Sequence, residues 1–143
     1  SSHTPWAPLP HMVPWNQIGD GSIFDPQPAE GRTPDQVWQH ASDVQANYAK
    51  SIRYSLASLV EFARTSNDPN LVLVVLGDHQ PWGEVSGDSP THNVPISIIA
   101  HDPAVLSRID SWHWQSGLLP KPDAPLWPMN AFRNRFFSAY DSP

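Results

Sequence analysis

The longest periodic pattern of apolar residues in the chain runs from residue 37 to residue 62 and has helical spacing. Three helix signals precede it, because Thr33 suits the N-cap, Pro34 the first helical position and Gln36 the capping-box position. We therefore expect a helical segment from Thr33 to about Arg64, either as one long helix or as two helices with a kink. Its buried stripe consists of Val37, Ala41, Val44, Tyr48, Ile52, Leu56, Leu59, Val60 and Phe62.

Two short apolar runs after this segment predict strands. Residues 71–76 are apolar at every position, which is typical of a strand that is covered on both faces in a parallel sheet. Residues 94–100 form the second run, and Pro95 is tolerated near its beginning, where no ladder N–H is needed. The order of helix, turn and buried strand indicates an α/β fold, in which we expect a partial sheet with flanking helices.

Two further helices are expected towards the end of the chain. Asp102 is interpreted as a turn former, and the residues from Pro103 to Ile109 can form a short helix. Residues 128–140 predict a last helix. Its apolar face consists of Met129, Phe132, Phe136 and Tyr140.

The first part of the chain, residues 1–31, has no sustained helix or strand period and is expected to be an ordered loop. A loop of this length either wraps over a functional surface or packs against a part of a longer parent protein. The first residue is Ser1, with no targeting segment before it, so we expect a piece of a longer protein. We treat residues 1–143 as a single segment with a loop-rich part, 1–32, and an α/β part, 33–143.

Composition narrows the possible partners. The 17 proline and 7 tryptophan residues indicate stiff loops that are held in place by large aromatic side chains. The net charge of −6, with only 8 Lys and Arg, gives no basic surface, so we expect no nucleic-acid partner. The longest apolar run is far shorter than the roughly 20 residues that span a bilayer, so we expect no direct membrane insertion. The absence of cysteine excludes disulfides and thiolate metal sites.

Candidate chemistry follows the first expected strand. Asp78 and His79 come directly after it, where loops collect functional side chains in open α/β sheets. Carboxylate and imidazole are ligands of zinc and manganese, although an Asp-His pair after a strand is also a common turn. His92 precedes the second strand, which is the wrong end of a parallel sheet. It joins the pair only if the second strand is antiparallel or if its loop folds back over the sheet edge.

Three motifs in a fixed order point to a family. They are Ser-His-Thr-Pro with His3, an apolar strand ending in Gly-Asp-His, and His-Asn-Val-Pro with His92. This set resembles the C-terminal part of the alkaline phosphatase and sulfatase superfamily, with the membrane-anchored phosphoethanolamine and lipoteichoic-acid-type transferases as the nearest group. The resemblance implies that Asp78 and His79 bind a catalytic divalent metal, zinc or manganese. It also implies that His92 contacts a second metal or the substrate phosphate, and that His3 lies near the transferred group.

The resemblance further implies an enzyme that acts on phosphate or sulfate esters. In this family the nucleophilic Ser or Thr and further acidic ligands lie N-terminal to these motifs, so this chain lacks them and we expect it to be inactive alone. Hydrolysis and transfer both stay open. The implied location is outside the cytoplasmic membrane, tethered through a missing N-terminal membrane region, and the missing N-terminal part is itself a partner of this segment.

Two other interpretations stay open. The chain is alternatively a non-catalytic extracytoplasmic binding module, whose Trp- and Pro-rich loops recognise a glycan or peptide, or a pseudoenzyme that serves as an interaction domain. Gln80 stands where many relatives have Gly after the Asp-His pair, which puts the subfamily in question. Trp6, Trp15 and Trp82 flank the expected site segments and either line a substrate cleft or pack the loops.

Overall fold

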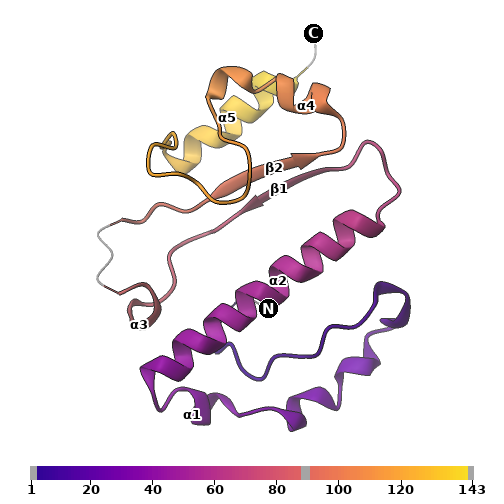
Figure 1. The fold of residues 1–143 in the computed structure, drawn as a ribbon, viewed down its shortest axis with the longest axis vertical. Coiled ribbons are helices and arrows are strands. Elements are labelled where there is room, and N and C mark those ends of the chain that lie inside the picture. Colours follow the sequence, from indigo (N-terminus) through magenta and orange to yellow (C-terminus); the bar gives the residue numbers. More distant parts are fainter. Residues whose placement is uncertain (1–2, 88–90, 142–143) are drawn as a thin grey trace. The chain divides into compact units, whose positions relative to one another are not determined.

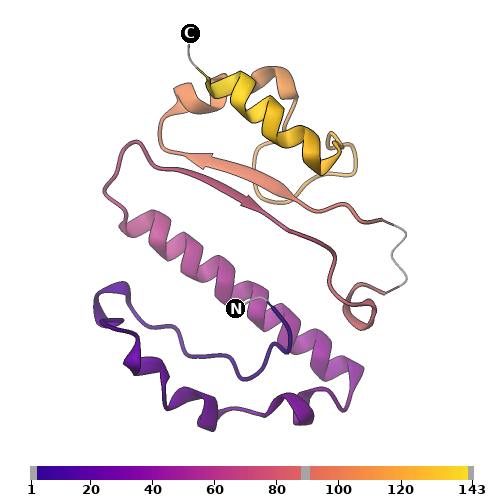
Figure 2. The same ribbon diagram turned by 180° about the vertical axis from the view of Figure 1, so that it is seen from behind.

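The computed structural model describes residues 3–87 and 91–141, and within them the chain is mostly helical with one small antiparallel sheet (Figures 1 and 2). The α-helices are α1 (Pro34–Val37), α2 (Ala41–Thr65), α3 (Gly83–Ser86), α4 (Pro103–Ser107) and α5 (Met129–Tyr140), and the strands are β1 (Val72–Leu76) and β2 (Ile96–Ala100). Short 3-10 helices are η1 (Trp15–Gln17), η2 (Ser22–Phe24), η3 (Gln27–Glu30) and η4 (Asp110–Trp112). Among the helices of the described residues, none combines the length and the apolar character needed to cross a bilayer.

The chain forms two compact units. The first, here the N-terminal unit, consists of residues 1–67 and 81–89, and the second, here the C-terminal unit, of residues 68–80 and 90–143. The N-terminal unit therefore contains α1, α2 and α3, and the C-terminal unit contains the sheet, α4 and α5.

The helical segment of the N-terminal unit is divided into two helices. The predicted capping box is confirmed: the Thr33 hydroxyl accepts from the Gln36 backbone N–H, and the Gln36 side chain accepts from the Thr33 backbone N–H at 2.9 Å. This start places Val37 in the core, where it is fully buried. The chain leaves helical geometry after Trp38, and α2 then continues for 25 residues.

The loop before α1 runs along α2. Near its beginning, Trp6 is buried and makes an edge contact with Tyr48 at 5.2 Å between ring centroids. Further along, Trp15 makes an edge contact with Phe62 at 6.0 Å. Because these partners lie at two positions along the same helix, the loop is anchored by its aromatic side chains, and in Figure 1 it follows α2 for much of its length.

The sheet differs from the one that the apolar runs predict. β1 and β2 pair antiparallel, with Val72 opposite Ala100 and Leu76 opposite Ile96, so the expected parallel arrangement is wrong. The expectation that β1 is covered on both faces is also wrong, because Val72, Val74 and Leu76 are 38%, 37% and 49% exposed. Among the described residues the sheet has two strands, so β1 is an edge strand and the face carrying these three side chains stays open.

An aromatic cluster forms the core of the C-terminal unit. Trp112 is buried and its ring centroid lies 5.1 Å from those of Trp114 and Trp127 and 6.3 Å from that of Phe132. The cluster continues along the predicted face of α5, where Phe132 contacts Phe136 at 5.6 Å. Edge and tilted contacts of this kind are the favoured geometries of aromatic pairs.

Two contacts fix α4 and α5 within this unit. The Asp102 side chain accepts from the Ala104 backbone N–H at 2.8 Å, so Asp102 acts as the N-cap of α4, in line with its predicted place in a turn. The Tyr140 hydroxyl donates to the Val105 carbonyl at 3.0 Å and links the end of α5 to α4. In both views α4 and α5 lie on the β2 side of the sheet.

Candidate functional site

The antiparallel pairing brings the loop after β1 and the loop before β2 to the same end of the sheet. The Gly77 backbone N–H donates to the Pro95 carbonyl at 3.0 Å, which extends the ladder beyond the strands. The Gln80 side chain then donates to the Asn93 carbonyl. Of the two arrangements that would place His92 at the end of the sheet occupied by Asp78 and His79, the structure has the antiparallel one.

Gly77 allows this close approach. A Cβ atom at this position would lie 3.1 Å from Val94 Cβ, closer than most real Cβ contacts. The backbone of the two loops therefore meets directly after the strands, and a larger residue at this position would separate them. Gln80, which departs from the family pattern, has a physical role as the link between the two loops.

Asp78 and His79 form a compact pair at this end. Asp78 Oδ2 lies 3.5 Å from His79 Nε2, and both side chains are largely exposed. The other carboxylate oxygen, Asp78 Oδ1, accepts from the His79 backbone N–H at 3.0 Å. One carboxylate oxygen is thus used to fix the turn, and the other faces the imidazole.

The contact of the His79 ring with its own loop determines which nitrogen carries a proton. His79 Nδ1 lies 2.7 Å from the Gln80 carbonyl oxygen. Because a carbonyl oxygen only accepts, Nδ1 must donate, and in the neutral imidazole Nε2 then carries the lone pair. A carbonyl that holds one ring nitrogen in this way is a common arrangement around histidine metal ligands.

The described residues contain no group of three His, Cys, Asp or Glu side chains that could hold a metal ion. The structure therefore brings together Asp78 and His79, but it does not add His92 to them as a third ligand. His92 is exposed and lines a neighbouring cavity of the same unit. His3 belongs to the N-terminal unit, where its side chain is exposed and Nδ1 donates to the Thr4 carbonyl at 2.9 Å.

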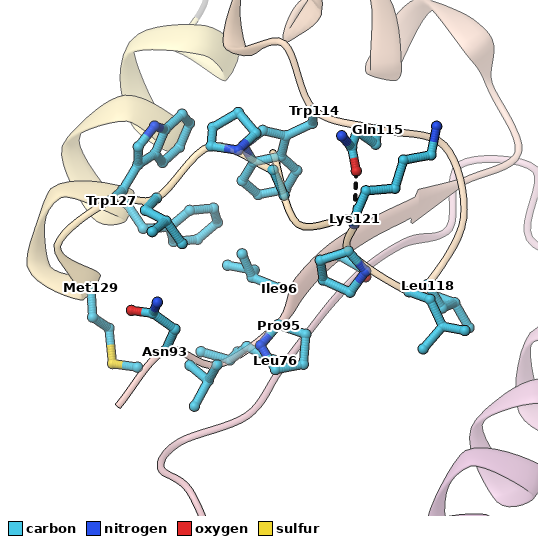
Figure 3. A pocket seen from close by; sticks show the side chains of 18 of the residues that line it. Leu76, Asn93, Pro95, Ile96, Trp114, Gln115, Leu118, Lys121, Trp127 and Met129 are labelled. Carbon is cyan, nitrogen blue, oxygen red and sulfur yellow. Dashed lines mark hydrogen bonds between the residues drawn. The ribbon is translucent and has the colours of Figure 1, made fainter. Parts of the chain in front are cut away.

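The cavity beside His92, here called the loop cavity, has a volume of about 700 Å³. Leu76 and Ile96 line it from the strands, and Trp114, Leu118 and Trp127 line it from the segment between β2 and α5 (Figure 3). This cavity was not predicted from the sequence. The available signal was the concentration of Trp and Pro between residues 112 and 128, which indicated rigid loops without showing what they enclose.

The tryptophans that flank the site segments in the sequence mainly pack the N-terminal unit. Trp6 is buried and stacks on Trp38 at 5.7 Å between ring centroids. Trp38 in turn stacks on Trp82 at 5.2 Å. Trp82 is the most exposed of these, at 55%. Trp6 and Trp15 thus have packing roles, whereas the Trp82 side chain stacks on Trp38 and is about half exposed to solvent.

Comparison of the chain with models of known protein families, with curated proteins and with solved structures finds no match. The family resemblance consequently depends on the three short motifs, and the chemistry has to be argued from the geometry of the site.

Proposed function

We propose that this chain is the metal-binding part of an enzyme that acts on phosphate or sulfate esters, with Asp78 and His79 as ligands of a divalent ion. The observation that carries the proposal is the approach of two lone-pair atoms, Asp78 Oδ2 and His79 Nε2, to 3.5 Å in an exposed loop. Each side chain is oriented by a hydrogen bond through its other polar atom.

The spacing of the two atoms suits a metal. Zinc binds imidazole nitrogen and carboxylate oxygen at about 2.0–2.2 Å, so two ligands of a tetrahedral site lie about 3.4 Å apart. Without a cation, two lone pairs at 3.5 Å repel each other unless the imidazole is protonated, in which case the pair is an ordinary exposed ion pair. The donor types therefore fit zinc or manganese, and further ligands would have to come from water, substrate or a longer protein.

Within this proposal, each residue of the site has its own role in catalysis. When bound, the divalent ion polarises an oxygen of the phosphate or sulfate group and favours the ionised form of a hydroxyl nucleophile. Asp78 and His79 hold the ion, while His92 stabilises charge on the transferred group or gives a proton to the leaving oxygen. A role for His3 near the transferred group is implied only by the family resemblance of its Ser-His-Thr-Pro motif. The nucleophilic Ser or Thr would come from a preceding part of a longer protein, and its covalent ester would be resolved by water or by another alcohol.

The finer expectations about the fold and its setting belong to the same proposal. The two-stranded sheet would be part of a larger alkaline-phosphatase-like sheet, and the unpaired edge of β1 is compatible with the addition of further strands. The parent would be located outside the cytoplasmic membrane and tethered through a preceding membrane region. Structure determination of the longer protein would test the first point, and its location in fractionated cells would test the second.

The direct test is calorimetric titration of Zn²⁺ and Mn²⁺ into the 143-residue chain and three variants. We expect Asp78→Asn and His79→Gln each to weaken zinc binding by at least about tenfold, since each removes one ligand. His101→Gln is the matched control, because His101 and Asp102 form another adjacent His–Asp pair, located after β2. It should change the affinity less than twofold. Absence of zinc binding, or binding that neither site substitution weakens, would overturn the proposal.

A second candidate function is a non-catalytic module that recognises a glycan through aromatic side chains. The observation that favours it is the stack of Trp38 on Trp82, with both rings partly exposed in the N-terminal unit. Exposed tryptophan faces provide large, rigid contact areas for such ligands. Glycan binding that Trp82→Ala abolishes, together with no zinc binding, would establish this function instead.

A further inference from the structure

The loop cavity is open to solvent on one side, and hydrogen bonds hold the segment that lines it in one shape. The Gln115 side chain accepts from the Lys121 backbone N–H and donates to the Asp123 carboxylate, both at 2.9 Å. The Ala124 backbone N–H donates to the Lys121 carbonyl at 3.0 Å. Four prolines between residues 120 and 128 add stiffness because each fixes its own φ. A wall fixed in this way lowers the ordering cost of binding a ligand.

Aromatic contacts also hold the rings that line the cavity. Trp127 makes an edge contact with Trp112 at 5.1 Å between ring centroids, and the Arg135 guanidinium lies over the Trp127 ring at 4.3 Å. Trp114 is held by Trp112 at 5.1 Å and stacks on Phe132 at 6.3 Å. The rings that line the cavity are therefore fixed by Trp112 and Arg135, which do not line it, and by one another, so the cavity exists before any ligand arrives.

The lining specifies a ligand with a large apolar part. Its volume of about 700 Å³ lies within the range of about 300–1,000 Å³ that is typical of small-molecule sites. Leu118, Leu126 and Met129 are among its lining residues and are at least half exposed, so apolar surface is available to a ligand. Burial of an apolar group against such surface is the main source of affinity in sites of this kind.

The charge of the lining is opposite to that of the whole chain. The chain has a net charge of −6, but among the residues that line the cavity Lys121 is positively charged and none is Asp or Glu. Figure 3 shows the Lys121 side chain extending away from Ile96 and Asn93. The lining is therefore compatible with a negatively charged ligand and offers no carboxylate to a cationic one.

One end of the cavity, here called its mouth, lies beside the loop that carries the candidate metal pair. Leu76, the last residue of β1, lines the cavity and stands two residues before Asp78. Asn93 also lines it, and its carbonyl accepts from the side chain of Gln80, the residue after His79. The cavity thus begins at the end of the sheet where the proposed metal ligands lie.

From these observations we infer that the loop cavity binds the apolar alcohol portion of an anionic ester, such as an aryl phosphate or sulfate, with its charged group at the His92 end. This inference rests on the proposed function for the role of the ester, and it adds the substrate class: esters of bulky apolar alcohols rather than of small polar ones. His92 faces the anion, and the rings of Trp114 and Trp127 face the apolar group.

The test uses 1-naphthyl phosphate as the probe, titrated calorimetrically into the metal-free 143-residue chain, with 1-naphthol and inorganic phosphate titrated in parallel. We expect saturable binding of 1-naphthyl phosphate at one site. It should be at least about tenfold tighter than binding of inorganic phosphate, because only the ester fills the apolar cavity. Addition of Zn²⁺ should tighten binding of the ester and leave 1-naphthol unchanged.

A pair of variants on α5 locates the binding. Met129 lines the cavity and Phe137 does not, while both are 55% exposed on the same helix. Met129→Glu places a carboxylate in the lining and should weaken 1-naphthyl phosphate at least about tenfold, since it repels the head and removes apolar contact. The new Glu at the first helical position suits the helix dipole, so the helix should be retained. Phe137→Glu should change the affinity less than twofold.

The outcomes separate the two proposals. Binding of 1-naphthyl phosphate that only Met129→Glu weakens, without any zinc binding, supports the cavity and overturns the metal proposal. Zinc binding without saturable binding of the ester overturns the cavity inference and leaves the metal proposal intact. Equal effects of the two variants would also overturn the inference. So would sedimentation that shows a dimer of the chain whose contact occupies the cavity in place of the ester.

Discussion

Replacement of Trp112 by alanine tests whether the aromatic cluster organises the C-terminal unit. Trp112 is only 8% exposed, and its ring contacts those of Trp114, Trp127 and Phe132. Burial of a tryptophan removes about 150–250 Å² from water, which at about 25 cal/mol per Å² corresponds to about 4–6 kcal/mol. Measured losses for Trp→Ala in protein cores are about 3–5 kcal/mol, and we expect a value in this range.

Such a loss is a large part of the roughly 5–15 kcal/mol by which domains are usually stable. The measurement is urea denaturation followed by far-UV circular dichroism, with near-UV circular dichroism to report on the order of the remaining tryptophans. Phe137→Ala is the control, because Phe137 is 55% exposed on α5, and it should cost less than about 1 kcal/mol. If Trp112→Ala destabilises the chain no more than this control does, the cluster does not organise the unit.

The same substitution links stability to the proposed ligand site. Trp112 does not line the loop cavity, but two of the rings it contacts, Trp114 and Trp127, do. Trp112→Phe keeps an aromatic ring in the cluster and should retain more of the stability than Trp112→Ala. If the cavity is formed in advance by this packing, the affinity for 1-naphthyl phosphate should follow the near-UV signal across the three proteins. An unchanged affinity in a chain that has lost this signal would contradict the argument.

Two further predictions concern titrating groups. A hydrogen bond from Arg32 lowers the pKa of Asp43. The contribution of this carboxylate to stability is therefore present above the usual carboxylate range and is lost as the pH falls through the lowered pKa. In an NMR titration, Arg32→Gln should raise the pKa of Asp43, and an unchanged midpoint would refute the assignment. Burial raises the pKa of Tyr140, whose stabilisation is therefore complete below the usual tyrosine range and lost as the pH rises through the raised pKa. Tyr140→Phe removes the bond to Val105 and should cost about 1 kcal/mol at pH 7 in urea denaturation; the cost should shrink at pH values above the tyrosine range, and a constant cost would refute the reasoning.

Local signals in the sequence predicted local structure well. Thr33 and Gln36 form the expected capping box, and Asp102 caps a short helix at the expected turn, because each of these features depends on contacts within a few residues. The break after Trp38 is different. It carries no Gly or Pro, and the Trp38 ring stacks on both Trp6 and Trp82, which are distant in the sequence. Tertiary contacts of this kind leave no periodic signal, so the sequence could not choose between one helix and two.

The environment of β1 was predicted incorrectly for a related reason. A run of apolar residues records the absence of polar side chains, and it does not specify the direction or number of neighbouring strands. The antiparallel partner and the exposed face with Val72, Val74 and Leu76 both depend on the rest of the chain. The loop cavity was missed because its lining comes from strand ends and from a distant Trp- and Pro-rich segment, whose encounter is a property of the folded unit.

Strand direction is what makes a single site at this end of the sheet possible. A strand of five residues spans about 14 Å at about 3.4 Å per step, whereas a metal reaches its ligands at about 2.0–2.2 Å. If β2 ran parallel to β1, the loop with His92 would begin at the opposite end of the strands, beyond the reach of a ligand bound at Asp78 and His79. The antiparallel register instead pairs Leu76 with Ile96 and allows Gln80 to bond to the Asn93 carbonyl. The proposed metal ligands, His92 and the mouth of the loop cavity therefore share one end of the sheet, which is the arrangement that an ester with a charged head and an apolar body requires.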